Sequence, residues 1–116
     1  MSKYRAIKDT RIINGETVTF DSRAEARRFD ELHTLAKAGK IKDLTLQPRY
    51  LLVDTLRVVG HRTMPKRHYV ADFRYVDGNG RTIVEDVKGM VTPVYSLKKQ
   101  LFLSIYGTEI IFKEIK

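Results

Sequence analysis

Residues 69–89, with the sequence YVADFRYVDGNGRTIVEDVKG, predict two β-strands joined by a short turn. The segments on either side of DGNG are rich in the aromatic and β-branched residues that strands favour. Acidic side chains interrupt both segments: Asp72 lies in the first, and Glu85 and Asp86 lie in the second. Charged side chains seldom occupy the buried part of a strand unless they are paired. Their presence therefore indicates a role beyond packing.

The length of the turn decides which acids face each other. Side chains alternate between the two faces of a strand, so a shift of one residue exchanges the faces. A two-residue turn in the DGNG segment places Asp72 opposite Glu85, whereas a three-residue turn places Asp72 opposite Asp86. We favour the three-residue turn, because Gly80 supplies the left-handed residue that such a turn requires.

Two facing carboxylates indicate a cation site. Their Cβ atoms would lie roughly 5 Å apart, and the like charges would repel. A divalent cation relieves this repulsion, and two acids completed by water describe a Mg²⁺ site, with Mn²⁺ as a substitute. Lys88 shares a strand face with Asp86 and could bind a phosphate oxygen or a metal-bound water. The alternative is that Asp72 and Asp86 keep an edge strand soluble and that Lys88 is their ion-pair partner.

Capping residues and apolar spacing predict two helices. The first occupies most of residues 20–40, because Ser22 is a good N-cap and Glu25 completes a capping box. Glu25 therefore has two candidate roles, as a helix cap and as a metal ligand. The second helix lies within residues 91–107, with Thr92 as its cap. Its expected buried side consists of Val94, Leu97, Leu101, Phe102 and Ile105.

The remaining segments predict strands and complete an α/β fold. Asn14-Gly15 predicts a β-hairpin near the N-terminus. Further strand segments are residues 44–60, broken at Gln47-Pro48, and residues 67–76, 81–88 and 108–115. A strand reached through a helix usually lies parallel to its neighbour. The expected architecture is a hairpin followed by α-β-β-β-α-β, forming one mixed sheet flanked by helices. We expect a single domain over residues 1–116, in which residues 1–9 form a loose basic arm.

Composition and charge narrow the classes of function. The chain has 116 residues, no cysteine and a formal net charge of +8. The absence of cysteine excludes disulfides and thiolate metal sites. No apolar run approaches the ~20 residues of a membrane span, and the first residues lack the apolar core of a secretory signal. We therefore expect no membrane partner and a cytoplasmic location, which is the host cytoplasm if a phage encodes the protein.

The positive charge is concentrated in segments without acids, which is typical of nucleic-acid binding. Residues 55–71 contain four cations and no acid, and residues 87–108 contain three lysines and no acid. Two further arginines lie on the first predicted helix. The candidate DNA-binding residues are Arg62, Lys66, Arg67, Lys98, Lys99, Arg23 and Arg27.

The order of the acids resembles the motif of the PD-(D/E)XK nuclease superfamily. Asp72 matches the first Asp of that motif, and the segment Asp86-Val87-Lys88 matches its second acid and its lysine. Glu25 matches the acid that many members carry on the first helix, and Ala71 stands where the motif has proline. The resemblance implies metal binding by Asp72, Asp86 and Glu25. It implies a catalytic role for Lys88 as well.

The resemblance extends over nearly the whole chain. It implies a restriction-endonuclease-like core and Mg²⁺-dependent hydrolysis of DNA that leaves a 5′-phosphate. The segments that carry it are FDSRAEARRFDEL (20–32), GKIKDLTLQPRYLL (39–52), YVADFRY (69–75), VEDVKG (84–89) and YSLKKQLF (95–102). Together they resemble small phage-encoded nucleases, and in size and layout the archaeal-type Holliday junction resolvases.

The expected substrate is branched DNA. A chain this short has little left for a module that reads bases, so recognition should rest on phosphates and shape. Symmetric cutting of a four-way junction in DNA recombination needs two sites, which predicts a homodimer with twofold symmetry. The alternatives are a nuclease for flaps or DNA ends, a nuclease subunit of a transposition or packaging machine, and a DNA-binding module without catalysis.

Overall fold

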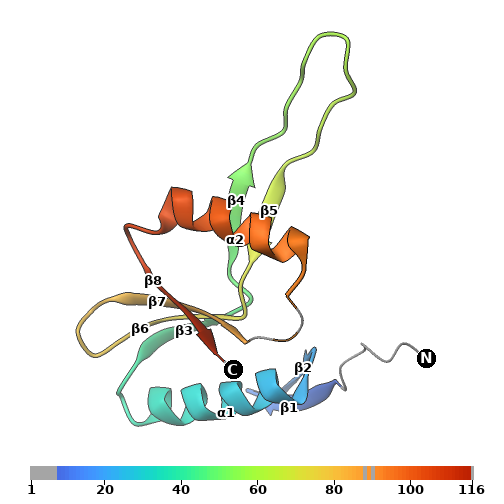
Figure 1. Ribbon diagram of the computed structural model, residues 1–116. Helices are drawn as coiled ribbons and strands as arrows, with labels where there is room; N and C mark the ends of the chain where they lie inside the picture. Colours follow the sequence, from blue (N-terminus) through green and yellow to red (C-terminus); the bar gives the residue numbers. More distant parts are fainter. Residues whose placement is uncertain (1–7, 88, 90, 116) are drawn as a thin grey trace.

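The computed structural model describes residues 8–87, 89 and 91–115, and it has a mixed α/β architecture (Figure 1). Four strands form the main sheet in the order β3-β6-β7-β8. They are β3 (Lys42–Leu46), β6 (Phe73–Val76), β7 (Thr82–Val87) and β8 (Ile111–Ile115). β7 and β8 are parallel and the other neighbours are antiparallel, so the predicted mixed character of the sheet is confirmed. β4 and β5 form a separate two-stranded sheet instead of joining it.

Two helices cover opposite faces of this sheet (Figure 1). α1 (Arg23–Lys37) packs on one face and α2 (Pro93–Tyr106) on the other, each with its own apolar cluster. Both predicted caps are confirmed: the Glu25 N–H donates to Ser22 Oγ over 3.1 Å, and the Tyr95 N–H donates to Thr92 Oγ1 over 3.0 Å. Neither helix is long and apolar enough to cross a membrane, within the residues that the structure describes.

The predicted buried side of α2 is wrong in most of its positions. Phe102 alone among its five residues is fully buried, whereas Val94, Leu97 and Ile105 remain 64%, 59% and 46% exposed. The reason is that α2 packs through aromatic side chains. The Phe102 ring stacks on Tyr69 and contacts Tyr50, both at 4.8 Å between ring centroids. This contact directs the apolar stripe that contains Leu97 away from the core.

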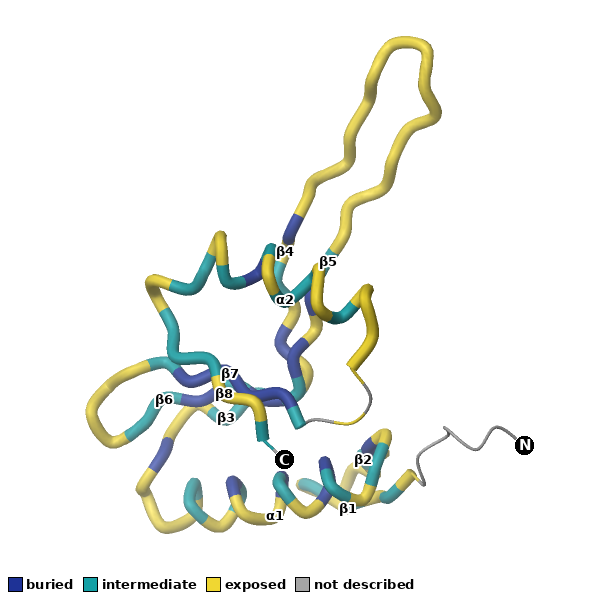
Figure 2. Tube along the Cα trace, viewed as in Figure 1, coloured by how far each residue is buried: buried dark blue, intermediate teal, exposed yellow. Residues whose placement is uncertain are grey.

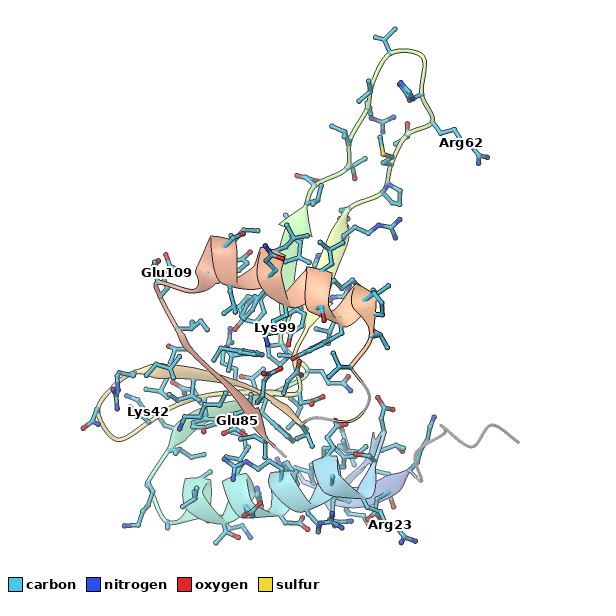
Figure 3. All side chains as sticks on the ribbon, viewed as in Figure 1. Arg23, Lys42, Arg62, Glu85, Lys99 and Glu109 are labelled. Atoms are coloured by element: carbon cyan, nitrogen blue, oxygen red, sulfur yellow. The ribbon has the colours of Figure 1, made fainter. Side chains whose placement is uncertain are left out.

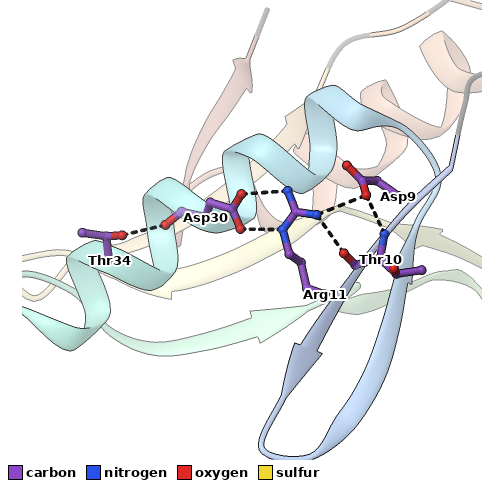
Figure 4. Close-up of polar contacts among 5 residues, drawn as sticks. All are labelled: Asp9, Thr10, Arg11, Asp30 and Thr34. Atoms are coloured by element: carbon purple, nitrogen blue, oxygen red, sulfur yellow. Dashed lines mark hydrogen bonds and ion pairs between the residues drawn. The ribbon is translucent and has the colours of Figure 1, made fainter.

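The predicted N-terminal hairpin is confirmed, with β1 (Asp9–Ile13) paired to β2 (Glu16–Phe20). Asn14 and Gly15 have φ values of 52° and 84°, as a two-residue turn requires. Arg11 fastens this hairpin to α1 through two 2.8 Å hydrogen bonds to the Asp30 carboxylate (Figure 4). The predicted loose arm over residues 1–9 is wrong at Asp9, which begins β1; residues 1–7 lie outside the described residues.

The predicted strand over residues 67–76 is two strands in the structure. β5 (Arg67–Val70) pairs with β4 (Arg49–Val53), whereas β6 joins the main sheet. The break faces the predicted break at Gln47-Pro48 in the neighbouring chain segment. The Ala71 N–H donates to Pro48 O over 3.1 Å, and the Gln47 N–H donates to Asp72 O over 3.0 Å. The two segments therefore bend at the same level. The predicted order α-β-β-β-α-β holds if β3 and β4 are counted as one strand and β5 and β6 as another.

The three-residue turn between β6 and β7 is confirmed. The Asp77 N–H donates to Arg81 O over 2.9 Å, and Gly80 has a φ of 79°. Phe73 pairs with Glu85 as a result, which is the last pair of this register. Beyond it the Asp72 N–H donates to Glu85 O over 3.1 Å, which places Asp72 beside the end of β7, where Asp86 lies.

β7 is buried on both faces, which separates its two acids. Ile83 belongs to the apolar cluster beneath α1, and Val84 belongs to the cluster beneath α2. Alternation then directs Glu85 toward α1 and Asp86 toward α2. Each acid therefore meets a different set of partners.

Glu85 is a structural acid (Figure 3). Its side chain is fully buried and accepts two 2.7 Å hydrogen bonds from the guanidinium of Arg28 on α1. The hydroxyl of Tyr75 also donates to it. Two charge-assisted bonds from one guanidinium satisfy both carboxylate oxygens. Glu85 therefore joins the sheet to α1.

Removal of Arg28 should destabilise the fold strongly, because it leaves Glu85 charged and buried without compensation. We expect Arg28→Ala to lower the free energy of unfolding by about 3–5 kcal/mol, measured by chemical denaturation. Arg27→Ala, at the exposed neighbouring position, is the matched control and should change it little. Equal stabilities for the two variants would contradict the structural role of the pair.

Candidate active site

Asp72 and Asp86 lie together in the wall of an open cavity of about 390 Å³. The cavity lies between β5, the end of β7 and the first turns of α2. Tyr69, Tyr95 and Lys98 also line it. The two acids thus share a cavity that a ligand can enter, and Lys98 supplies a positive charge in its wall.

Burial and mutual proximity disfavour ionisation of both acids. Burial raises the pKa of Asp72 to about 8; the Val87 N–H, which donates to its carboxylate over 2.7 Å, acts in the opposite direction, and the charges of Glu25 and Asp86 raise the pKa further. Burial also raises the pKa of Asp86, against hydrogen bonds from Tyr69 and Asp72 that lower it. The pair therefore holds a proton near neutral pH or requires a cation in its place.

Glu25 lies behind the pair, at the first turn of α1. Burial and the charge of Asp21 raise the pKa of the Glu25 carboxyl group above its ordinary value, although the backbone of Asp21 acts in the opposite direction. Glu25 and Asp72 line a second, smaller cavity of about 80 Å³ together with Gln47. The charge of Glu25 therefore interacts with the charges of Asp72 and Asp86. The backbone N–H of Glu25 also donates to the helix cap Ser22.

The three acids do not form one coordination group. In the part of the chain that the structure describes, no three acidic, histidine or cysteine side chains are arranged to hold a metal ion. The donors that converge are the two carboxyl groups of Asp72 and Asp86. Mg²⁺ is commonly held by one or two carboxylates, with water and substrate phosphate completing its shell. The chemistry of this pair therefore fits a divalent cation.

Tyr69 is a site residue that the sequence reasoning missed. Its hydroxyl donates to Asp86 Oδ2, and burial raises its own pKa, so the phenol stays protonated as a donor. A continuous strand over residues 67–76 would place Tyr69 and Asp72 on opposite faces. The break at Ala71-Asp72 changes the alternation and brings both side chains into one cavity. A signal for this break existed in Gln47-Pro48 of the neighbouring segment.

The predicted cations divide into different environments. Lys98 lines the cavity, whereas Lys99 forms a 3.0 Å ion pair with Glu114 of β8 (Figure 3). Lys88 lies outside the described residues. The remaining candidates are exposed and lie away from the cavity lining, on α1, in the segment that joins β4 to β5, or at the start of β5: Arg23, Arg27, Arg62, Lys66 and Arg67.

The fold and the site define a small α/β domain with a paired, buried carboxyl centre in an open cavity. The chain belongs to the DUF1064 family, described as proteins of unknown function, whose pattern matches residues 1–115. No curated protein sequence and no solved structure matches the chain.

The raised pKa of Asp72 predicts a pH-dependent stability. Between pH 4 and pH 8 the folded state binds more protons than the unfolded state, so stability should fall as pH rises through this window. Asp72→Asn removes this group and should make the protein more stable than wild type at pH 8, with little difference near pH 4. Thermal unfolding across the pH range measures the effect.

Glu109→Gln, which changes an exposed acid outside the cavity lining, is the control and should follow the wild-type profile. Parallel profiles for wild type and Asp72→Asn would show that burial does not perturb Asp72.

Proposed function

We propose that this protein is a Mg²⁺-dependent DNA endonuclease of the PD-(D/E)XK type. The observation that carries the proposal is the Asp72–Asp86 pair, buried and unfavourable as two free anions, in the wall of an open cavity. The order α-β-β-β-α-β, with helices on both faces of the sheet, supports a restriction-endonuclease-like core. The order of Asp72, Asp86 and Lys88 along the chain supports it as well.

Asp72 and Asp86 would hold the metal, and Glu25 is the third candidate ligand. Burial of the two carboxyl groups excludes water that would compete with them for the metal. The proton that the pair shares indicates that positive charge is favoured between them. When bound, Mg²⁺ supplies charge neutralisation at the phosphate and a water nucleophile at neutral pH. Mn²⁺ should substitute, because it also prefers oxygen ligands.

The neighbouring side chains would position the site and the substrate. The Tyr69 hydroxyl fixes the orientation of Asp86 through its hydrogen bond. Lys98 offers a positive charge at the cavity margin, where a scissile phosphate would enter. Lys88 is proposed to orient or deprotonate the attacking water, or to stabilise the charge that develops on the phosphate.

Branched DNA is the substrate that we propose, with a Holliday junction as the most specific form. The exposed cations suit phosphate contacts, and recognition by phosphates and shape favours a structure-selective enzyme. Resolution of a junction in recombination requires two active sites related by symmetry, which calls for a homodimer. We also propose that a phage encodes this protein and that the protein acts in the cytoplasm of the phage's host.

Asp86→Asn should abolish cleavage in Mg²⁺ and leave DNA binding intact. Loss of a ligand should cost more than the ~10–100-fold that follows loss of a group that supports a ligand. Gel assays of labelled junctions with Mg²⁺ and with EDTA measure cleavage and binding separately. The control is Glu109→Gln, an exposed acid outside the cavity lining. Undiminished cleavage by Asp86→Asn would refute the site assignment, and binding without cleavage by the wild type would leave a DNA-binding module.

Junction selectivity is the second expected property. A symmetric dimer should make paired nicks near the crossover of a four-way junction and spare a linear duplex of the same sequence at equal concentration. Light scattering should give a mass near twice 13.5 kDa. Equal cutting of duplex and junction, or a monomer that makes unpaired nicks, would contradict the resolvase assignment and leave the broader nuclease proposal.

A further inference from the structure

The segment between β4 and β5, residues 54–66, forms an arm that extends far from the two apolar clusters (Figure 1). Every residue of the arm is exposed, as the continuous yellow trace in Figure 2 shows. The arm is nevertheless ordered by its own backbone hydrogen bonds. Leu56 and Met64 exchange two bonds of 2.9 Å, and the His61 N–H donates to Val58 O over 3.0 Å. It is therefore a defined ribbon with a closed turn at its end.

An apolar side chain stands at the apex of this ribbon. Gly60 has a φ of 82°, which a type II turn requires at its third position and which leaves Val59 at the second. Val59 is 99% exposed, and its neighbour Val58 is also exposed. Leu56 and Met64 on the same ribbon are exposed as well, and a group of exposed apolar side chains that contributes nothing to the core indicates a partner.

The charge of the arm identifies the class of partner. Asp54 at the base is the one acid of the arm, and no further acid occurs as far as Ala71. Arg57, Arg62 and Lys66 lie on the arm, and Arg67 follows at the start of β5. Arg62 projects outward close to the apex (Figure 3). Pairing of two such arms from two copies would oppose like charges, whereas a phosphate backbone complements them. Apolar side chains flanked by cations are the arrangement with which proteins wedge open a base step and bend DNA.

The arm is also connected to the candidate active site. β5 carries the chain from the arm to Tyr69 and Asp72, both in the cavity wall. Val59 and Asp72 are thirteen positions apart in the chain, which at roughly 3.3 Å per strand residue allows a separation of up to about 43 Å. One turn of B-DNA measures about 34–36 Å. A duplex seated in the cavity can therefore meet the apex about one turn away from the cut.

We propose that residues 54–66 form a DNA-bending arm, in which Val59 wedges into a base step about one helical turn from the Asp72–Asp86 cavity while Arg57, Arg62 and Lys66 bind the flanking phosphates. This proposal rests on the proposed function only in taking DNA as the partner. It does not require cleavage.

The test compares Val59→Ser with wild type on a fluorescently end-labelled duplex of about three helical turns, in EDTA so that no cleavage occurs. Energy transfer between the ends reports bending. Wild type should bend the duplex, and Val59→Ser should lose most of the bending and bind severalfold more weakly. The salt slope of binding should not change, because no charge is removed. Ile12→Ser, at an exposed apolar position on the N-terminal hairpin, is the matched control and should behave as wild type.

Arg62→Ala should instead lower the log–log salt slope by about 1, because one phosphate contact is lost. Bending that is unchanged in Val59→Ser would overturn the proposal. A change of molecular mass in Val59→Ser, measured by light scattering, would assign the apex to self-association and overturn it as well.

Parallel cleavage assays in Mg²⁺, with a labelled four-way junction as the substrate, separate this proposal from the nuclease proposal. Bending that depends on Val59 without any cleavage would support the arm and overturn the nuclease function. Cleavage with bending that does not depend on Val59 would overturn the arm alone. Failure to bind DNA at any salt concentration would overturn both.

Discussion

The register of the β6–β7 hairpin is the constraint on which the fold and the candidate site both depend. The Asp77 carboxylate fixes the turn by accepting 2.9 Å hydrogen bonds from the backbone N–H groups of Asn79 and Arg81. Because β7 is buried on both faces, a slip of one residue would exchange the environments of its acids. Glu85 would enter the cavity, and Asp86 would face Arg28 of α1. The turn therefore decides which carboxylate is structural and which is available for chemistry.

The two acids show how partners determine the state of a buried carboxylate. Glu85 has a guanidinium that satisfies both of its oxygens, so it is stable as an anion at no exposure. The partners of Asp86 include the phenols of Tyr69 and Tyr95 and the carboxyl group of Asp72, and none of these three side chains carries a positive charge. Its environment is therefore completed by a proton or by a cation. This difference between adjacent residues of one strand distinguishes the candidate site from an ordinary buried ion pair.

Much of the fold follows from local signals in the sequence. The caps at Ser22 and Thr92, the turns at Asn14-Gly15 and Gly80, and the helix–strand order were all predictable from residue chemistry. Two features were not. The orientation of α2 depends on the tertiary contact of Phe102 with Tyr69, which helical spacing does not reveal. The position of Tyr69 depends on a strand break stabilised by hydrogen bonds to Gln47 and Pro48, which come from a different part of the chain.

The proposed nuclease function depends on Asp72 and Asp86 together forming a divalent-cation site. The most direct measurement is a crystal structure of the protein grown with Mn²⁺, in which anomalous scattering locates the metal. An anomalous peak is expected between the two carboxyl groups, with both coordinated to the metal and with the Tyr69 hydroxyl still bonded to Asp86. A peak elsewhere, or an Asp72–Asp86 pair that remains in direct contact at saturating Mn²⁺, would contradict it.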